Sequence, residues 1–311
     1  MPKKNIRLIY ILLSLLAFIS VTAISPLTAG ESDKITRVLT TFFPIYLFTL
    51  NLTYNIPDLQ LDILLPGDYG CPHDFSLAPD DIKKAHLADL VIINGMGLDD
   101  FIEDIVGGSD EISVIDATSG IAPLPSRSVH TGHDHESDGE QWNPHPFASP
   151  PQAQVMIARI AASLAHHLPR YAELINANAA DYQNRLDSVV TQYRSRLTNL
   201  SHPKVAAVHE IYDYLARDFG FQIVDIIEKE PGQEPSAREA IALSAELRRN
   251  KIAAIFSEPQ YSERMARTLA SELKIPVYVI DPVASGPSHP PRDYYETVML
   301  ENLENLVRAM K

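Results

Sequence analysis

The sequence contains a single cysteine, Cys71, among 311 residues. A lone cysteine cannot form an intramolecular disulfide, and it excludes zinc fingers and iron–sulfur clusters that are held by several thiolates. Basic residues are also few, because 26 Lys and Arg stand against 40 Asp and Glu and give a net charge of −14. Nucleic-acid binding depends on a basic surface, so this balance argues against a nucleic-acid partner.

No apolar run in the sequence is long enough to cross a bilayer as a helix. The run Leu8–Val21 has 14 residues and follows two lysines and an arginine within residues 3–7. This pattern is typical of a secretory signal peptide with cleavage near Gly30, and a retained anchor helix is the alternative. We therefore expect residues 1–30 to be removed. No cysteine follows the run closely, so we expect the mature protein to be periplasmic and not a lipoprotein.

Short apolar runs bounded by turn residues alternate with helical patterns from residue 31 onward. This alternation predicts an α/β fold with parallel-rich sheets that are flanked by helices. Four strands are expected in each half of the chain. They are Ile35–Thr41, Leu59–Leu65, Leu90–Asn94 and Ile112–Asp116 in the first half, and Lys204–Val208, Phe221–Ile227, Ala253–Ser257 and Val277–Ile280 in the second.

Helical patterns connect these strands and also separate the two halves. Ala153–His167 favours one helix, and Pro169 suits the first turn of a second helix that runs to about Leu200. Further helices are expected at Pro79–Ala88, Tyr212–Phe219, Ser236–Asn250, Ser262–Leu273 and Asp293–Met310. The predicted parts are a signal peptide (1–30), an N-terminal α/β domain (31–168), a rigid linker helix (169–201) and a C-terminal α/β domain (202–311).

One long segment, Ile121–Pro151, lacks a periodic pattern and is rich in Pro, Ser, Gly, Asp and His, so it is predicted to be a loop. Its middle part, residues 126–142, carries His130, His133 and His135 among four acidic residues. Imidazoles and carboxylates on a loop favour weak metal binding. A solvated acidic loop with incidental histidines is the alternative.

Polar side chains stand beyond the carboxyl ends of several predicted strands, where ligands bind in open α/β sheets. His209 and Asp281 follow their strands directly, His73 follows one through a short loop, and His145 lies near the end of the His-rich segment. Three imidazoles and one carboxylate can complete a tetrahedral shell around a divalent metal. Each residue taken alone also suits a surface or turn position, so the spacing leaves both interpretations open.

The motifs around these four residues are distinctive when they are taken in order. They are Pro72–Leu77, Ala88–Leu90, Asn143–His145, His209–Tyr214, Glu234–Ser236, Phe256–Gln260 and Ile280–Pro282. Over residues 33–311 their order and spacing resemble the solute-binding proteins of bacterial ABC importers for zinc and manganese, and especially the zinc-uptake branch.

The resemblance implies two pseudo-symmetric α/β domains joined by one long helix, with a metal ion between them. Its ligands would be His73, His145, His209 and Asp281, and the partner would be the membrane permease of an ABC importer. Manganese members usually have Glu where this chain has His209, and a third imidazole favours Zn²⁺ over Mn²⁺ as the transported ion. Four protein ligands leave no position for a reactive water, so we expect a binding protein and not an enzyme. The protein is also expected to be a monomer.

Some alternatives remain open on the sequence alone. The carboxylate of Glu210, next to His209, is an alternative to Asp281 in the metal shell. A zinc-dependent hydrolase with Glu210 as its general base and a surface adhesin are the rival functions. Cys71 is expected to be an inert small residue rather than a soft accessory ligand. Because ligand histidines must be neutral, affinity is expected to fall as the pH drops through about 6.5.

Overall fold

The computed structural model describes residues 35–72, 75, 77–106, 112–127, 141–228 and 234–311. Residues Thr36–Lys311 form one compact unit, to which Met1–Ile35 does not belong. The predicted signal peptide lies outside the described residues. Among the helices that are described, none combines the length and apolar character that a membrane span requires.

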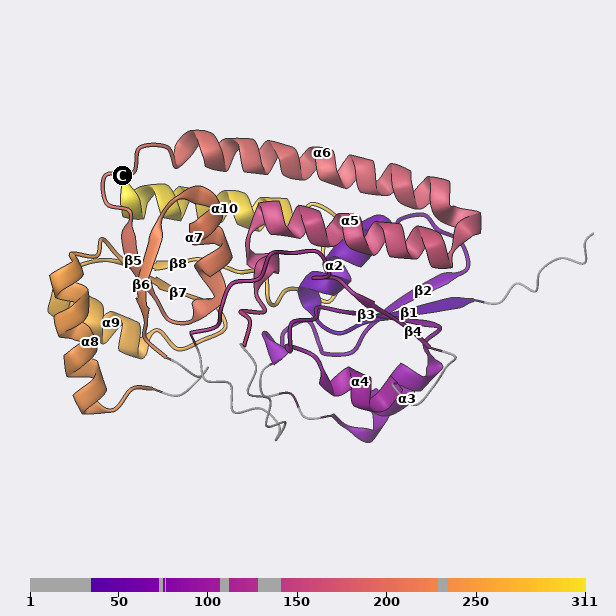
Figure 1. Ribbon diagram of the computed structural model, residues 1–311, viewed down its shortest axis with the longest axis horizontal. Helices are drawn as coiled ribbons and strands as arrows, with labels where there is room; N and C mark the ends of the chain where they lie inside the picture. The colour runs from indigo at the N-terminus through magenta and orange to yellow at the C-terminus, as the bar shows by residue number, and fades with distance from the viewer. Residues whose placement is uncertain (1–34, 73–74, 76, 107–111, 128–140, 229–233) are drawn as a thin grey trace, which may run out of the picture. The chain divides into compact units, whose positions relative to one another are not determined.

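The first sheet has four parallel strands in the order β2-β1-β3-β4. The strands are β1 (Thr36–Thr40), β2 (Leu59–Ile63), β3 (Leu90–Ile93) and β4 (Ser113–Asp116). The helices of this half are α2 (Phe43–Leu52), α3 (Pro79–Leu87) and α4 (Phe101–Val106). Figure 1 shows α3 and α4 on one side of the sheet and α2 on the other. Each predicted strand of this half is confirmed, and its ends agree with the prediction to within two residues.

The second sheet repeats this topology, with the order β6-β5-β7-β8 and all pairs parallel. Its strands are β5 (Lys204–Ala207), β6 (Gln222–Ile226), β7 (Ile255–Ser257) and β8 (Val277–Val279). Its helices are α7 (Asp213–Phe219), α8 (Ala237–Asn250), α9 (Arg264–Leu273) and α10 (Tyr294–Met310). The same strand order in both halves confirms the predicted pseudo-symmetric α/β fold. The domain boundaries stay a prediction.

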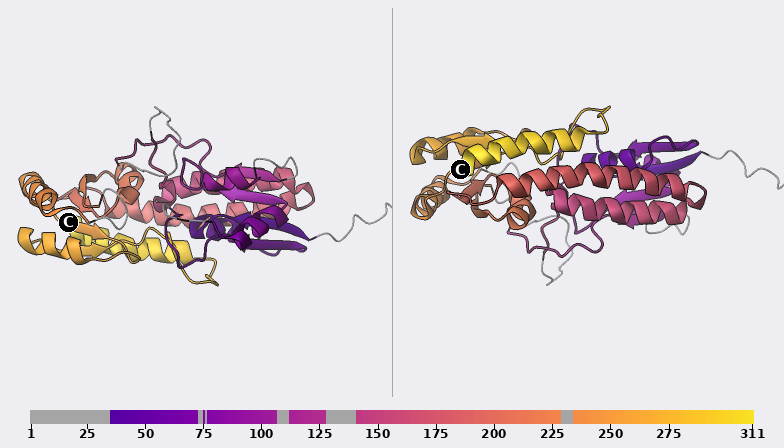
Figure 2. Two further views of the ribbon diagram at one scale, coloured as in Figure 1. Left: turned by 90° about the horizontal axis from the view of Figure 1, so that it is seen from below. Right: turned by 90° about the horizontal axis from the view of Figure 1, so that it is seen from above.

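A pair of helices joins the two halves. They are α5 (Pro150–His167) and, after a 3₁₀ turn at Pro169–Tyr171, α6 (Ala172–Arg196). With 25 residues, α6 spans about 38 Å at the usual rise per residue. Figure 2 shows α6 running beside α5 and α10, and α6 is in contact with both of these helices.

Both ends of this helical stretch differ from the prediction. The second helix ends at Arg196 instead of near Leu200, because Asn199 adopts a positive φ of 56°, a conformation that Asn tolerates and a helix does not. The first helix begins at Pro150 instead of Ala153, since proline is well suited to the first helical position. The predicted loop is therefore shorter, and it also contains a 3₁₀ turn, η2 (Pro146–Ala148).

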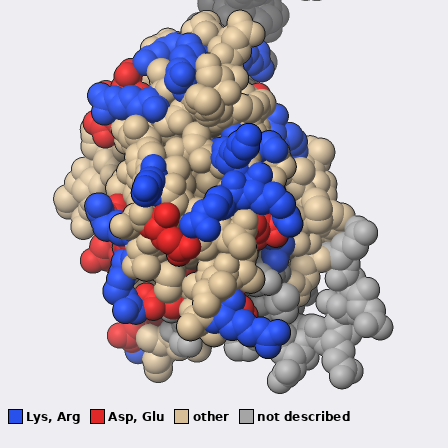
Figure 3. All heavy atoms as spheres, turned by 90° about the vertical axis from the view of Figure 1, so that its left-hand side faces the viewer, with Lys and Arg blue, Asp and Glu red and all other residues tan. Residues whose placement is uncertain are grey.

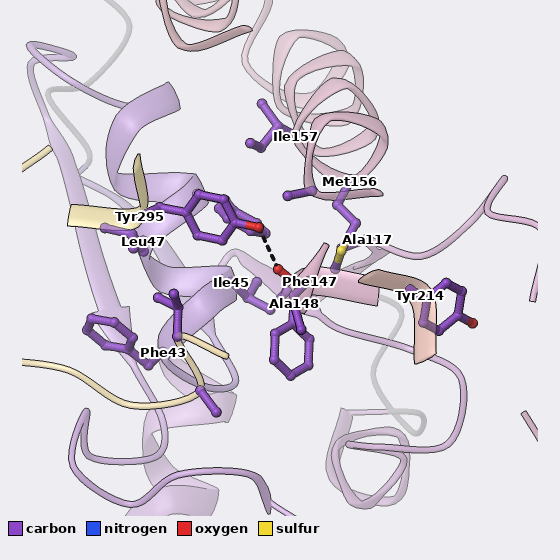
Figure 4. Close-up of a cluster of buried hydrophobic side chains, with 14 of the residues drawn as sticks. Phe43, Ile45, Leu47, Ala117, Phe147, Ala148, Met156, Ile157, Tyr214 and Tyr295 are labelled. Carbon is purple, nitrogen blue, oxygen red and sulfur yellow. Dashed lines mark hydrogen bonds between the residues drawn. The ribbon is translucent and has the colours of Figure 1, made fainter. Parts of the chain in front are cut away.

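The hydrophobic core is continuous between the two halves (Figure 4). Phe147 in η2 and Tyr295 in α10 are both fully buried, and the Tyr295 hydroxyl donates a 2.8 Å hydrogen bond to the Phe147 carbonyl. The Phe147 ring also packs edge-on against Phe42, at 5.3 Å between centroids. This packing fixes the backbone two residues after His145 and so positions that histidine.

A close backbone contact joins the loop after β2 to the segment after β8. The Gly286 N–H donates to the Gly67 carbonyl at 2.7 Å. A Cβ on Gly67 would lie 2.9 Å from the Gly286 oxygen, and one on Gly286 would lie 2.2 Å from the Phe43 ring. Only glycine fits at these two positions without displacement of the neighbouring atoms.

The acidic composition is not spread evenly over the surface. The face at the left of Figure 1, near α8 and α9, presents many Lys and Arg side chains with Asp and Glu among them (Figure 3). On these helices Arg248 pairs with Glu272 and Arg249 with Glu246, each at 3.1 Å. Basic side chains on this face thus have acidic partners on the same or the neighbouring helix.

Candidate metal centre

His209 stands just beyond β5, at the start of a 3₁₀ turn (Glu210–Tyr212) that leads into α7. Its side chain is buried, and its Nδ1 lies 2.7 Å from Oε1 of Glu258, which follows β7 directly. A carboxylate can only accept a hydrogen bond here, so Nδ1 carries a proton. Nε2 is buried and has no hydrogen-bond partner among the described residues, since Oε2 of Glu228 is 3.6 Å away.

The charge around His209 is unusual. Burial alone would lower the pKa of His209, but the carboxylates of Glu258 and Glu228 outweigh it and raise that pKa to about 9. Without metal, the imidazole is therefore protonated at neutral pH, and both acids balance its charge although only Glu258 is within hydrogen-bond distance. The midpoint near 6.5 that the sequence suggested for loss of affinity is wrong for this residue, because it assumed an unperturbed imidazole.

His145 lies immediately before η2 and is 2% exposed. Its backbone N–H and its ring Nδ1 both contact Oδ1 of Asn143, at 3.0 and 2.9 Å. An amide oxygen only accepts hydrogen bonds, so the ring donates from Nδ1 and the lone pair resides on Nε2. Both candidate ligand histidines in the described part of the chain thus have Nδ1 held and Nε2 as the nitrogen suited to a metal.

Asp281 lies just beyond β8, after Ile280. Its Oδ1 accepts the Val283 N–H at 2.8 Å, and its backbone pairs on both sides with the Asn302 amide. Burial, followed by the nearby charges of Glu258 and Glu301, raises the pKa of Asp281 to about 6, although the Val283 N–H opposes this. His209, Glu258 and Asp281 follow β5, β7 and β8, which are neighbours in that order, so all three lie at the carboxyl edge of the second sheet.

Gly70 and Cys71, which precede His73 in the chain, lie near Glu258 and Gln260. His73 itself lies outside the described residues, as do His130, His133 and His135. Cys71 is buried, and burial followed by the charges of Glu258 and Asp99 raises the pKa of its thiol well above the ordinary range. A Cβ on Gly70 would contact the Gln260 side chain, which donates to Glu258 Oε2 at 2.7 Å. Within the described ranges, no group of three or more His, Cys, Asp or Glu is placed to hold a metal ion.

Glu210 has a different position from its neighbour His209. Its carboxylate is 1% exposed and accepts hydrogen bonds from the Ser126 hydroxyl at 2.7 Å and the Arg127 N–H at 2.5 Å. Arg127 also pairs with Asp213 at 3.1 Å. Glu210 thus holds the first stem of the predicted His-rich loop against the second half of the chain.

The motif Phe256–Gln260 contains Glu258, but the sequence alone indicates no role for this residue or for Glu228. A signal for Glu258 was present, because it follows its strand directly, as Asp281 nearly does. Asn143 is likewise part of a motif, Asn143–His145, in which the sequence indicates a role only for the histidine. The pairing of an acid with a particular histidine 49 positions away depends on the strand order and is not visible in the sequence.

The sequence matches the family described as zinc-uptake complex component A, periplasmic (ZnuA), over residues 38–309. The chain belongs to the ZnuA family. The resemblance to solute-binding proteins of zinc importers is therefore confirmed. Among curated relatives, the zinc-binding lipoprotein AdcA of Streptococcus pneumoniae is 28% identical over 283 residues, which cover 89% of this chain and 56% of AdcA. The chain thus spans little more than half the length of these relatives.

Two solved structures share the ZnuA-type fold along nearly their whole length. FpvC of Pseudomonas aeruginosa in complex with Mn²⁺ is 28% identical, covers 89% of this chain and 99% of its own, and has a TM-score of 0.78. The Zn(II)-bound ZnuA-like domain of Streptococcus pneumoniae AdcA is 26% identical, covers 88% and 98%, and has a TM-score of 0.73. The fold class predicted from the sequence is confirmed by both.

Proposed function

We propose that this ZnuA-family chain captures Zn²⁺ as cargo between its two halves and delivers it to the membrane permease of an ABC importer. The ligands in this proposal are His73, His145, His209 and Asp281. The observation that carries it is the buried Nε2 of His209, which has no hydrogen-bond partner among the described residues while Nδ1 is held by Glu258.

A buried polar nitrogen without a partner is costly, at about 1–3 kcal/mol. A divalent metal ion bound at Nε2 removes this cost. A carboxylate on the far nitrogen of a ligating histidine orients the ring and increases its basicity, and this is the arrangement around His209. Glu228 and Glu258 also supply negative charge beside an incoming cation.

Zinc is favoured over manganese by the donor set. Three imidazoles and one carboxylate suit Zn²⁺, whereas Mn²⁺ prefers more oxygen ligands. The AdcA relatives are named as zinc-binding, and the AdcA domain structure holds Zn(II). The FpvC structures hold Mn²⁺ and Ni²⁺, so manganese is the alternative cargo and belongs in the experiment.

The rival functions have less support. A hydrolase would need Glu210 as a general base, but its carboxylate is buried and occupied by Ser126 and Arg127. A family of uptake components also favours binding over catalysis. Burial keeps the Cys71 thiol protonated, which favours a packing role for it.

The remaining parts of the proposal concern export and the loop. Residues 1–30 direct the chain to the periplasm, where the mature protein acts as a monomer without a lipid anchor. His130, His133 and His135 collect metal at low affinity. N-terminal sequencing of the exported protein tests the first point: a start near residue 31 without a lipid supports it, and an intact or lipidated N-terminus contradicts it.

The test of the cargo is metal competition. The mature protein is stripped with a chelator, dialysed against equimolar Zn²⁺ and Mn²⁺, and analysed for metal per chain. We expect one tightly held zinc that is lost in His209→Ala and kept in His166→Ala, which changes an exposed histidine on α5. Retained manganese would overturn the choice of metal, and equal metal content in the two variants would overturn the site.

A further inference from the structure

The geometry points to Asn143 as a positioning residue that sets the proton of the His145 ring and joins this ring to the backbone beside His209. This inference rests on the proposed function, because it concerns how two of the proposed zinc ligands are held. In this inference Asn143 is not itself a ligand of the zinc ion.

Asn143 is fully buried, and each of its polar groups is engaged. Its Oδ1 accepts from the backbone N–H and the ring Nδ1 of His145. Its Nδ2 donates to the Glu210 carbonyl at 2.9 Å. Its backbone N–H donates to the Leu124 carbonyl at 2.8 Å, and its carbonyl accepts from the Tyr214 hydroxyl at 2.9 Å.

This network leaves one orientation for the amide. The backbone N–H of His145 is a donor only, so the group that faces it must be the amide oxygen. The carbonyl of Glu210 is an acceptor only, so the group that faces it must be the amide nitrogen. An ionised aspartate could receive the His145 contacts but could not donate to Glu210. Asn143 therefore does two tasks that require an acceptor and a donor in one short side chain.

The two tasks connect the halves of the fold. His145 lies in the segment that follows the first sheet, while Glu210 belongs to the 3₁₀ turn Glu210–Tyr212 and Tyr214 to α7, both in the second half. The Tyr214 hydroxyl accepts the Leu124 N–H at 3.1 Å as well as donating to the Asn143 carbonyl. Leu124 and Asn143 are thus both hydrogen-bonded to residues that follow His209, namely Tyr214 and, for Asn143, also Glu210. These bonds hold His145 close to His209 in the metal-free protein.

The test determines which ring nitrogen of His145 carries the proton in the metal-free protein. Long-range ¹H–¹⁵N spectra of protein with ¹⁵N-labelled histidine at pH 8 distinguish the two neutral tautomers, and His145→Gln identifies the signal. We expect the Nδ1–H tautomer in the unmodified protein and in Asn143→Asp, and an Nε2–H population in Asn143→Ala. The control Asn178→Ala removes a buried amide on α6 that donates to Leu52 and Tyr54 carbonyls, and it leaves the His145 signal unchanged.

Zinc affinity provides the second readout. Asn143→Ala is expected to bind zinc about 10–100-fold more weakly, Asn178→Ala is expected to bind normally, and Asn143→Asp is expected to bind more tightly than Asn143→Ala.

An unchanged tautomer in Asn143→Ala, or an Asn143→Asp protein that binds no better than Asn143→Ala, overturns the positioning role. A changed tautomer with unchanged zinc affinity keeps the ring contact and instead overturns His145 as a zinc ligand, which is part of the proposed function. If Asn143→Ala fails to fold, the tautomer in Asn143→Asp still decides: Nε2–H there overturns the inference.

Discussion

Oε1 of Glu258 lies 2.7 Å from Nδ1 of His209, and the two side chains stand beyond neighbouring strands, β7 and β5, of the second sheet. The contact has two consequences. It leaves Nε2 of the ring as the nitrogen suited to a metal, and it contributes to the raised pKa of His209. The strand order brings these residues together, although they are 49 positions apart in the chain.

The raised pKa predicts how zinc affinity depends on pH. Zinc must displace a proton from His209, whose pKa is about 9, so apparent affinity is expected to rise roughly tenfold per pH unit between pH 7 and 9. In Glu258→Gln the imidazole loses a neighbouring negative charge, so its pKa falls and the rise with pH becomes shallower. Competition with a zinc chelator of known pH dependence measures both. A pH-independent affinity in the unmodified protein from pH 7 to 9 would contradict this account.

Removal of the His-rich segment is expected to spare the tight site. Its stems are fixed by backbone pairing between Pro125 and Trp142 and by the hydrogen bonds from Ser126 and Arg127 to Glu210. Deletion of residues 130–140 should therefore reduce the number of weakly bound zinc ions per chain and leave one tight zinc. Equilibrium dialysis over a range of zinc concentrations separates the two classes. Loss of the tight zinc would show that the loop belongs to the site.

Two arginines on α6 form matched ion pairs with glutamates on α10. Arg185 forms an ion pair with Glu296, whose side chain is 9% exposed, while Arg196 forms one with the half-exposed Glu304. Arg185→Met leaves a buried acid without its cation and is expected to lower the free energy of unfolding by about 3 kcal/mol. Arg196→Met breaks a surface pair that water screens, so it should cost much less. Urea unfolding compares them, and equal losses would contradict the difference in burial.

Asp99 is expected to make stability depend on pH. It is fully buried and accepts hydrogen bonds from Thr41, Asn94 and Gly95, yet burial still raises its pKa to about 6. The folded state binds this proton more tightly than the unfolded state, so the stabilising contribution is complete below pH 4 and is lost as the pH rises through 6.

The neutral variant Asp99→Asn lacks this contribution. Between pH 4.5 and pH 7, the unmodified protein should lose about 2 kcal/mol more of its free energy of unfolding than the variant does. Asp80→Asn, which changes an exposed acid on α3, should behave like the unmodified protein. The same pH profile for Asp99→Asn and the unmodified protein would refute the prediction.

Most of the fold could be predicted because buried parallel strands are short apolar runs between turn residues. The capping box of Ser236 and Glu239 likewise marked the start of α8. The helix α2 was missed, because Phe43–Leu52 is buried on nearly every side and so shows no helical alternation of polar and apolar residues. Its apolar composition alone does not distinguish a buried helix from a strand.

The candidate site was predictable only in part. Placement beyond strand ends singled out His209 and Asp281, since this depends on local pattern. The partners that determine their chemistry, such as Glu258 for His209 and Asn143 for His145, depend on side-chain contacts between elements. The raised pKa of His209 was therefore not visible, and neither was the involvement of Glu210 with the loop stem.

A crystal structure of the zinc-loaded protein, with anomalous data collected on both sides of the zinc absorption edge, tests the central claim most directly. We predict one strong peak at about 2.0–2.1 Å from Nε2 of His209, with Nε2 of His145, a nitrogen of His73 and a carboxylate oxygen of Asp281 completing the shell. A peak held elsewhere in the chain, with Nε2 of His209 not bonded to it, would contradict the account.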